Sequence, residues 1–189
     1  MSNSEEFKEQ LKEIKNEKLR DLVEKQLNNI PEYFYHIAAS STSKYHNVQE
    51  SGEGGLVRHV KAVFKIARDL IDLEMFAPIS IYRDEILAAA ILHDSLKMGQ
   101  TEQKYTVFEH PKLAAESFEQ IALKENYEDQ DSIKRICAMI LAHSGQWNTN
   151  KYSKITLPKP SNKIENFLHL CDYLGSRRYI TVTSLDEFD

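Results

Sequence analysis

The stretch that most constrains the fold of this chain is "AAAILHDSLKMG", which runs from Ala88 to Gly99. Its apolar residues would cover every side of a helix, so the pattern predicts a helix over residues 81–98 at the centre of a bundle. His93, Asp94 and Lys97 interrupt this apolar run. Because a buried charge without a partner is costly, these side chains require buried partners or a metal ion.

The rest of the chain shows further helical periodicities. Residues 4–30 contain no Gly or Pro, which predicts one amphipathic helix that ends before Pro31. Helices are also expected over residues 55–73, 111–124, 130–143 and 161–179, with a short aromatic helix within residues 31–40. Residues 41–55 and 144–161 are polar connections, and residues 179–188 are expected to form a short strand or a tail.

These elements predict an all-α fold, a helical bundle with its functional site between the core helices. Residues 1–30 are expected to form an N-terminal amphipathic helix that packs on the domain formed by residues 31–189, so that the chain is a single domain overall. The glycines at positions 52, 54 and 55 are not followed by the Lys of a P-loop. We interpret them as a turn into the helix that follows.

Composition excludes several classes of protein. The chain of 189 residues is 41% apolar and 28% charged, without an apolar run of the length needed for a membrane span, so no membrane partner is expected. The polar N-terminus is unlike a signal peptide, and two separate cysteines suit a reducing cytoplasm. The net charge of −5 argues against long duplex nucleic acid but leaves nucleotides and short single strands open. The oligomeric state is left open.

Several His and Asp residues fall on the inward stripes of different predicted helices. Taken singly, each is more often a core or capping residue than a ligand. Their recurrence on separate helices favours a site for Zn, Fe, Mn, Co or Ni, which bind imidazole nitrogen and carboxylate oxygen. The residues concerned are His59, His93, Asp94, His110, His143 and Asp172.

The order of these residues, with the segments "GGLVRHVKAV", "AAILHDSLK", "EHPKLAAE", "ILAHSGQW" and "LHLCDYLGSRR", resembles the HD-domain superfamily of metal-dependent phosphohydrolases. The resemblance covers about residues 30–180 and looks most like the HD domain of certain bacterial 3′→5′ exoribonucleases, here without their OB-fold. Two positions depart from the family pattern: Leu96 stands where Gly is frequent, and Ser144 where a second His is frequent.

The resemblance implies one or two divalent transition-metal ions (Mn, Fe, Ni, Co or Zn) and a metal-activated water that hydrolyses a phosphomonoester or phosphodiester. Lys97 would contact the phosphate, and Asp94 would bridge the ions as the second catalytic residue. The first ion would be held by His59, His93, Asp94 and Asp172, and the second by Asp94, His110 and His143.

Other residues are predicted to bind the substrate, a nucleotide or a short oligonucleotide. Arg177 and Arg178 follow Asp172 by five and six residues, so at least one can reach the rim of the site. Trp147 and Tyr45 are candidates for stacking on a base.

Two alternatives remain open at this stage. Some HD-like folds use the same six ligands to hold two irons and oxidise substrates with O₂, and iron content with O₂ consumption would discriminate that chemistry. A non-enzymatic nucleotide-binding module is the other alternative, against which the intact ligand set argues.

Overall fold

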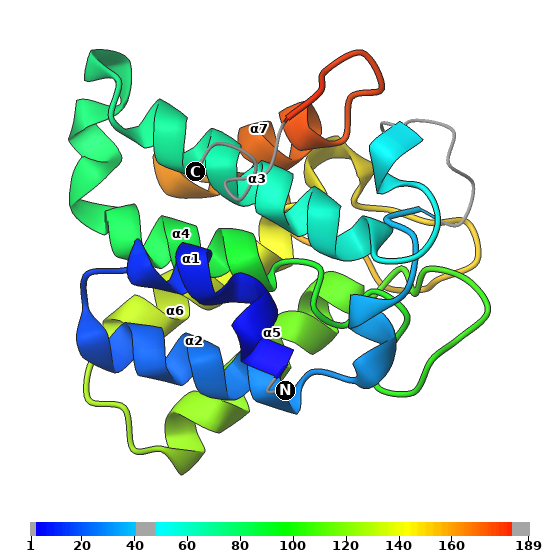
Figure 1. Ribbon diagram of the computed structural model, residues 1–189, viewed down its shortest axis with the longest axis horizontal. Coiled ribbons are helices and arrows are strands. Elements are labelled where there is room, and N and C mark those ends of the chain that lie inside the picture. Colours follow the sequence, from blue (N-terminus) through cyan, green and yellow to red (C-terminus); the bar gives the residue numbers. More distant parts are fainter. Residues whose placement is uncertain (1–2, 41–47, 183–189) are drawn as a thin grey trace.

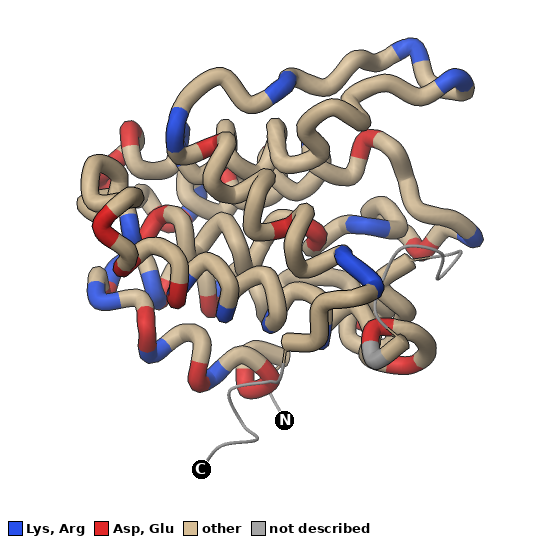
Figure 2. Tube along the Cα trace, turned by 90° about the horizontal axis from the view of Figure 1, so that it is seen from above, with Lys and Arg blue, Asp and Glu red and all other residues tan. Residues whose placement is uncertain are grey.

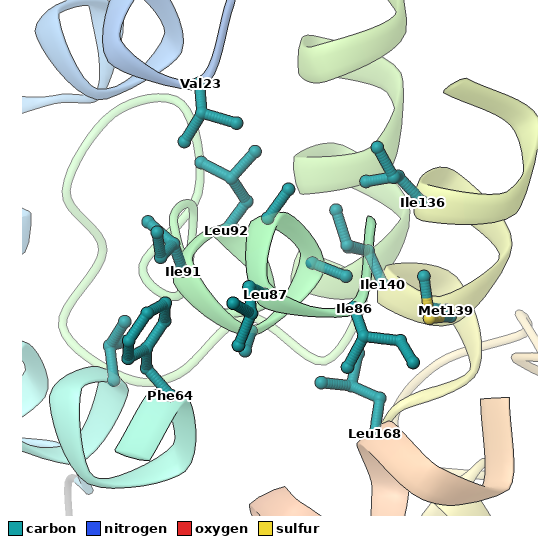
Figure 3. Close-up of a cluster of buried hydrophobic side chains, with 14 of the residues drawn as sticks. Val23, Phe64, Ile86, Leu87, Ile91, Leu92, Ile136, Met139, Ile140 and Leu168 are labelled. Carbon is teal, nitrogen blue, oxygen red and sulfur yellow. The ribbon is translucent and has the colours of Figure 1, made fainter. Parts of the chain in front are cut away.

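Helix α4 (Arg83–Leu92) lies at the centre of the protein, a computed structural model that describes residues 3–40 and 48–182. Every residue from Ile86 to Leu92 is buried. Figure 3 looks along this helix and shows its side chains pointing outward in all directions toward other helices. Their neighbours are Val23 on α2, Phe64 on α3, Ile136, Met139 and Ile140 on α6, and Leu168 on α7. The central helix predicted from the apolar run is therefore confirmed.

Six further α-helices complete the bundle around and beside α4 (Figure 1), and the described residues contain no strand. The all-α fold is confirmed. Helices α3 and α4 pack on α7, α5 packs on α6, and α2 packs on both α4 and α5. Among the described helices, none has the length and apolar character that crossing a bilayer requires. The six helices are α1 (Lys8–Lys12), α2 (Glu17–Asn29), α3 (Gly55–Ile71), α5 (His110–Lys124), α6 (Gln130–Ala142) and α7 (Lys163–Gly175).

The prediction of one helix over residues 4–30 is wrong, because the segment divides into α1 and α2. The Asn16 side chain accepts a hydrogen bond from the Leu19 amide and so begins a new helix. The fully buried Ile14 lies in the connection, which lets the two apolar stripes of the segment face the core at different angles. The Asn16 amide donates to the Asp84 carboxylate at 2.7 Å, which ties this break to the start of α4.

The predicted helix over residues 81–98 is also too long, because α4 ends at Leu92. Residues 93–99 form consecutive tight turns, in which the amide of Lys97 donates to the Asp94 carbonyl at 3.1 Å. Gly99 has a φ of +87°, which ends this segment. Tyr33 fixes the segment from outside, since its hydroxyl donates to the Gly99 carbonyl at 2.6 Å and accepts from the Met98 amide at 3.2 Å.

The remaining expectations differ from the structure mainly at element ends. The short aromatic helix is a single 3-10 turn over Glu32–Tyr35, and α7 is shorter than the predicted 161–179. Residues 180–182 form no strand, whereas residues 183–189 and residues 41–47, with Tyr45, lie outside the described part of the chain.

Candidate metal centre

The ends of several helices meet at one point and bring the predicted ligands together. His93 and His143 directly follow the last residues of α4 and α6, and His110 is the first residue of α5. His59 lies in the N-terminal part of α3, and Asp172 lies on α7. All four histidine side chains are at least 90% buried.

Asp94 lies between two groups of histidines. Its Oδ2 atom is 3.7 Å from Nε2 of His59 and 3.5 Å from Nε2 of His93. Its Oδ1 atom is 2.9 Å from Nε2 of His110 and 3.7 Å from Nε2 of His143. Within each group the potential ligand atoms lie within 4.8 Å of one another, so Asp94 is common to two possible metal sites.

Asp172 extends the first group from the side of α7. Its Oδ1 atom lies 3.2 Å from Nε2 of His59 and 3.8 Å from Nε2 of His93. The structure therefore brings all six predicted ligands into one cluster, four around the first position and three around the second, with Asp94 in both.

Main-chain hydrogen bonds orient three of the four histidine rings. The Nδ1 atom of His93 lies 2.8 Å from the Ala90 carbonyl oxygen, and those of His110 and His143 lie 2.7 Å from the carbonyl oxygens of Val107 and Ile140. In each case the acceptor is three residues back along the chain. When the proton of the neutral ring is on Nδ1, Nε2 is unprotonated and can bind a metal, and Nε2 is the nitrogen that faces Asp94.

The donor atoms of this cluster fit a bound metal ion. Nε2 of His93, Nε2 of His110 and Oδ1 of Asp94 are buried and make no hydrogen bond of acceptable geometry. Buried polar atoms normally have partners, and metal coordination would satisfy all three. Imidazole nitrogen and carboxylate oxygen are also the ligands that Zn, Fe, Mn, Co and Ni accept. These buried His and Asp groups could therefore hold metal ions.

The electrostatics of the cluster favour neutral imidazoles at His93 and His143 and an ionised carboxylate at Asp94. Burial lowers the pKa of His93 and lowers that of His143 to about 3. Burial alone would raise the pKa of Asp94, but Lys97 and the neighbouring histidines hold it well below its usual value. His59 differs: burial opposes its protonation, yet Asp172 and Glu50 raise its pKa to about 9. In the metal-free protein, the His59 ring is therefore protonated on both nitrogens, and positively charged, at neutral pH.

Lys97 lines a cleft of about 540 Å³, together with residues of the cluster. Its Nζ atom contacts the Asp94 carboxylate, and its side chain is 12% exposed. Four predicted ligands also line the cleft, namely Asp94, His110, His143 and Asp172. His59 and His93 are fully buried and lie deeper. The other lining residues include Thr106, Ser144, Trp147, Tyr173 and Arg177.

One wall of the cleft is a stack of Trp147, Tyr173 and Arg177. The Trp147 and Tyr173 rings are nearly parallel, at 7° and 5.9 Å between centroids, and Trp147 is 53% exposed. The Arg177 guanidinium lies 4.0 Å from the centroid of the Tyr173 ring. Arg177 Nε also donates to the Tyr173 carbonyl at 2.9 Å, so Arg177 both lines the cleft and caps the end of α7.

Arg178 lies outside the cleft, contrary to the prediction that it binds substrate. Helix α7 ends at Gly175, so helical spacing from Asp172 does not set the direction of residue 178, which is exposed and is not among the residues lining the cleft.

The segment that carries Trp147 is held by His169. The Nδ1 atom of His169 lies 2.7 Å from the His143 carbonyl oxygen. Gly145 has a φ of +59°, and a Cβ there would lie 2.2 Å from the His169 ring. Close packing of this ring on the chain after α6 therefore fixes both the carbonyl of His143 and the turn that leads to Trp147.

Sequence analysis missed three residues that contribute to the site. Tyr173 follows the ligand Asp172 and could have been recognised as part of an aromatic wall. Tyr33 lies in the aromatic stretch of residues 31–40, where no sequence signal indicates its contact with residues 98 and 99. Glu50 lies in a polar connection without periodicity, yet its Oε2 atom is 3.4 Å from Nδ1 of His59.

Comparison with known proteins identifies one family. A family model described as HD domain matches residues 56–176, nearly two thirds of the chain, and this span contains all six clustered residues. No curated protein and no solved structure matches the chain. The likeness to the HD domain of exoribonucleases therefore stays a prediction.

The shared position of Asp94 predicts that one substitution disrupts both metal sites. Asp94→Ala removes an oxygen from each group and should lose the transition metal that the unaltered chain retains when purified without chelator. Elemental analysis of both proteins measures this loss. Asp69→Ala, at an exposed position on α3, is the control and should retain the metal. Equal metal content in the Asp94→Ala and unaltered proteins would contradict the assignment.

The raised pKa of His59 predicts that metal binding at the first group is coupled to proton release. Below about pH 9 the metal must displace the His59 proton, so apparent affinity should rise about tenfold per pH unit from pH 6.5 to 8.5. Calorimetry in two buffers of different ionisation enthalpy measures both affinity and proton release. His143→Ala should keep this slope, because burial already leaves His143 neutral in that range. Affinity that does not change with pH would contradict the prediction.

Proposed function

The chain belongs to the HD domain family, and we propose that it is a metal-dependent phosphohydrolase that acts on a nucleotide or a short oligonucleotide. The observation that carries this proposal is the position of Asp94. Its two oxygens face two groups of buried histidines, and one of them, Oδ2, also contacts the ammonium of Lys97, which lines the cleft.

The cluster has the parts that phosphoester hydrolysis requires. Divalent ions, when bound, supply Lewis acidity and lower the pKa of coordinated water. The chain itself supplies the ligands, the cleft that admits a substrate and the cations that meet its phosphate. No Ser or Cys nucleophile is required for this chemistry.

Lys97 is suited to neutralise charge on a phosphate. The contact with Asp94, three residues earlier, holds its ammonium in the lining of the cleft beside the ligand cluster. A protonated ammonium cannot ligate a metal, so its role is toward the substrate. A cation fixed in a largely buried position stabilises developing negative charge more strongly than one in water.

The dimensions and chemistry of the cleft support a small substrate that carries both a base and a phosphate. A volume of about 540 Å³ lies in the range of small-molecule sites. Trp147 offers an exposed indole on which a base can stack, and Lys97 and Arg177 provide cations in the lining of the cleft.

The distribution of charge supports the same limit on substrate size. Along the tube in Figure 2, Lys and Arg positions are mixed with Asp and Glu positions over most of the described chain, and the connection between α6 and α7 carries Lys151, Lys154 and Lys159 without an acidic residue. Affinity for long nucleic acid grows with the number of phosphates that basic side chains neutralise. The cations of this cleft suit few phosphates, so a nucleotide or very short oligonucleotide is the expected substrate.

We expect the Lys97→Ala variant to lose turnover but to retain its metal. Removal of one charge-stabilising group of this kind lowers kcat by about 10²–10³-fold. The effect should fall mainly on kcat if the contact forms in the transition state. Metal content and kinetics measured on the same preparation test this. Lys104→Ala, at an exposed position nearby, should behave as the unaltered protein. A Lys97→Ala protein that loses its metal, or that keeps full activity, would overturn the role.

A substrate series tests the proposed function as a whole. The chain, loaded in turn with Mn²⁺, Co²⁺ and Ni²⁺, is assayed against mononucleotides, cyclic dinucleotides and single strands of increasing length, with products separated. Catalytic efficiency should be highest at the short end. Processive degradation of long RNA would refute the size limit, whereas O₂ consumption by an iron-loaded chain, or binding without turnover, would refute phosphoester hydrolysis itself.

A further inference from the structure

His59 differs from the other histidines of the cluster in the partner of its second ring nitrogen. The Nδ1 atoms of His93, His110 and His143 each face a main-chain carbonyl oxygen at a helix end. Nδ1 of His59 instead lies 3.4 Å from Oε2 of Glu50, a longer contact whose geometry falls short of a hydrogen bond.

The position of His59 within its helix explains this difference. His93 and His143 follow the last turns of α4 and α6, where helical hydrogen bonds leave carbonyl groups available. His59 lies inside α3, whose carbonyl groups accept the helix's own amides. An acceptor for its Nδ1–H must therefore come from another segment.

The chain before α3 is built to bring Glu50 to this position. The Glu50 carbonyl accepts the amide of Ala39 at 3.1 Å. A Cβ at Gly55 would lie 2.0 Å from that carbonyl oxygen, so only glycine allows the approach. Gly54 has a φ of +69°, which turns the chain back into α3. The Glu50 side chain is 6% exposed as a result.

We propose that Glu50 is a positioning residue of the metal centre. In the metal-bound protein its carboxylate accepts the Nδ1–H of His59, selects the tautomer that directs Nε2 to the first metal position, and places a negative charge behind that ligand. A carboxylate in this position makes a histidine a stronger metal ligand, and its loss typically weakens affinity about 10–100-fold. This inference depends on one part of the proposed function, namely that the cluster binds metal.

The first test measures the affinity of the metal-free full chain for Co²⁺ by competition with a chromophoric chelator, at about pH 9, where competition from the His59 proton is small. Glu50→Gln keeps the size of the side chain but removes its charge, and it should weaken the tighter Co²⁺ site about 10–100-fold and shift its visible absorption. Glu53→Gln makes the same change at an exposed position of the same segment and should leave both unchanged. Unchanged affinity in Glu50→Gln would overturn the proposal.

A double-mutant cycle separates action through His59 from a general effect on fold or charge. In a His59→Ala background, Glu50→Gln should change Co²⁺ affinity less than about threefold, because the ring it orients is gone. In a His143→Ala background, which retains the first group, the full loss should persist. The same loss in both backgrounds would overturn the proposal.

A measurement on the unaltered chain keeps the proposal testable if the variants do not fold. In the Zn²⁺-loaded protein, imidazole ¹⁵N–¹H spectra should show a slowly exchanging Nδ1–H for His59, further downfield than those of the carbonyl-bonded histidines. A His59 ring without this proton would overturn the proposal. Because none of these readouts uses a substrate, a chain that hydrolyses no phosphoester still decides the role of Glu50.

Discussion

The burial of Asp94 is the constraint on which the rest of the structure depends. A carboxylate that is 1% exposed is costly unless charges and hydrogen-bond donors surround it. Lys97 and the rings of four histidines supply this environment from four helices or their ends. Helices α3, α4, α5 and α6 must therefore converge at one point, and the apolar surface of α4 holds them there (Figure 3).

The ends of α4 and α6 meet two requirements with one set of contacts. The last carbonyl groups of a helix lack amide partners within it. At both ends a histidine that follows the helix places its Nδ1 2.7–2.8 Å from one of these carbonyl oxygens. The hydrogen bond satisfies the carbonyl and also turns Nε2 toward Asp94. Ligand orientation is thus a consequence of where the helices end.

The parts of this arrangement that follow from local periodicity could be predicted from sequence. The surrounded central helix follows from the apolar run at residues 86–92, and the inward histidines follow from their spacing to apolar neighbours. The break at Asn16 and the end of α4 at Leu92 depend on contacts across the fold, with Asp84 and Tyr33, that periodicity does not contain. Glu50 lies in a connection without any period, so only its place in three dimensions indicates its contact with His59.

The carboxylates of the centre are distributed unequally between its two groups, and this affects how a phosphate would meet them. Asp172 and Glu50 both contact His59, whereas the charge of Asp94 is opposed by Lys97. The histidines of the second group, His110 and His143, line the cleft. An ion held by the first group would therefore be largely neutralised by protein carboxylates, whereas one held by the second would keep more of its charge. With metals bound, a phosphate in the cleft would therefore be drawn toward the second group, while Lys97, which contacts Oδ2 of Asp94, would meet it from the side of the first group.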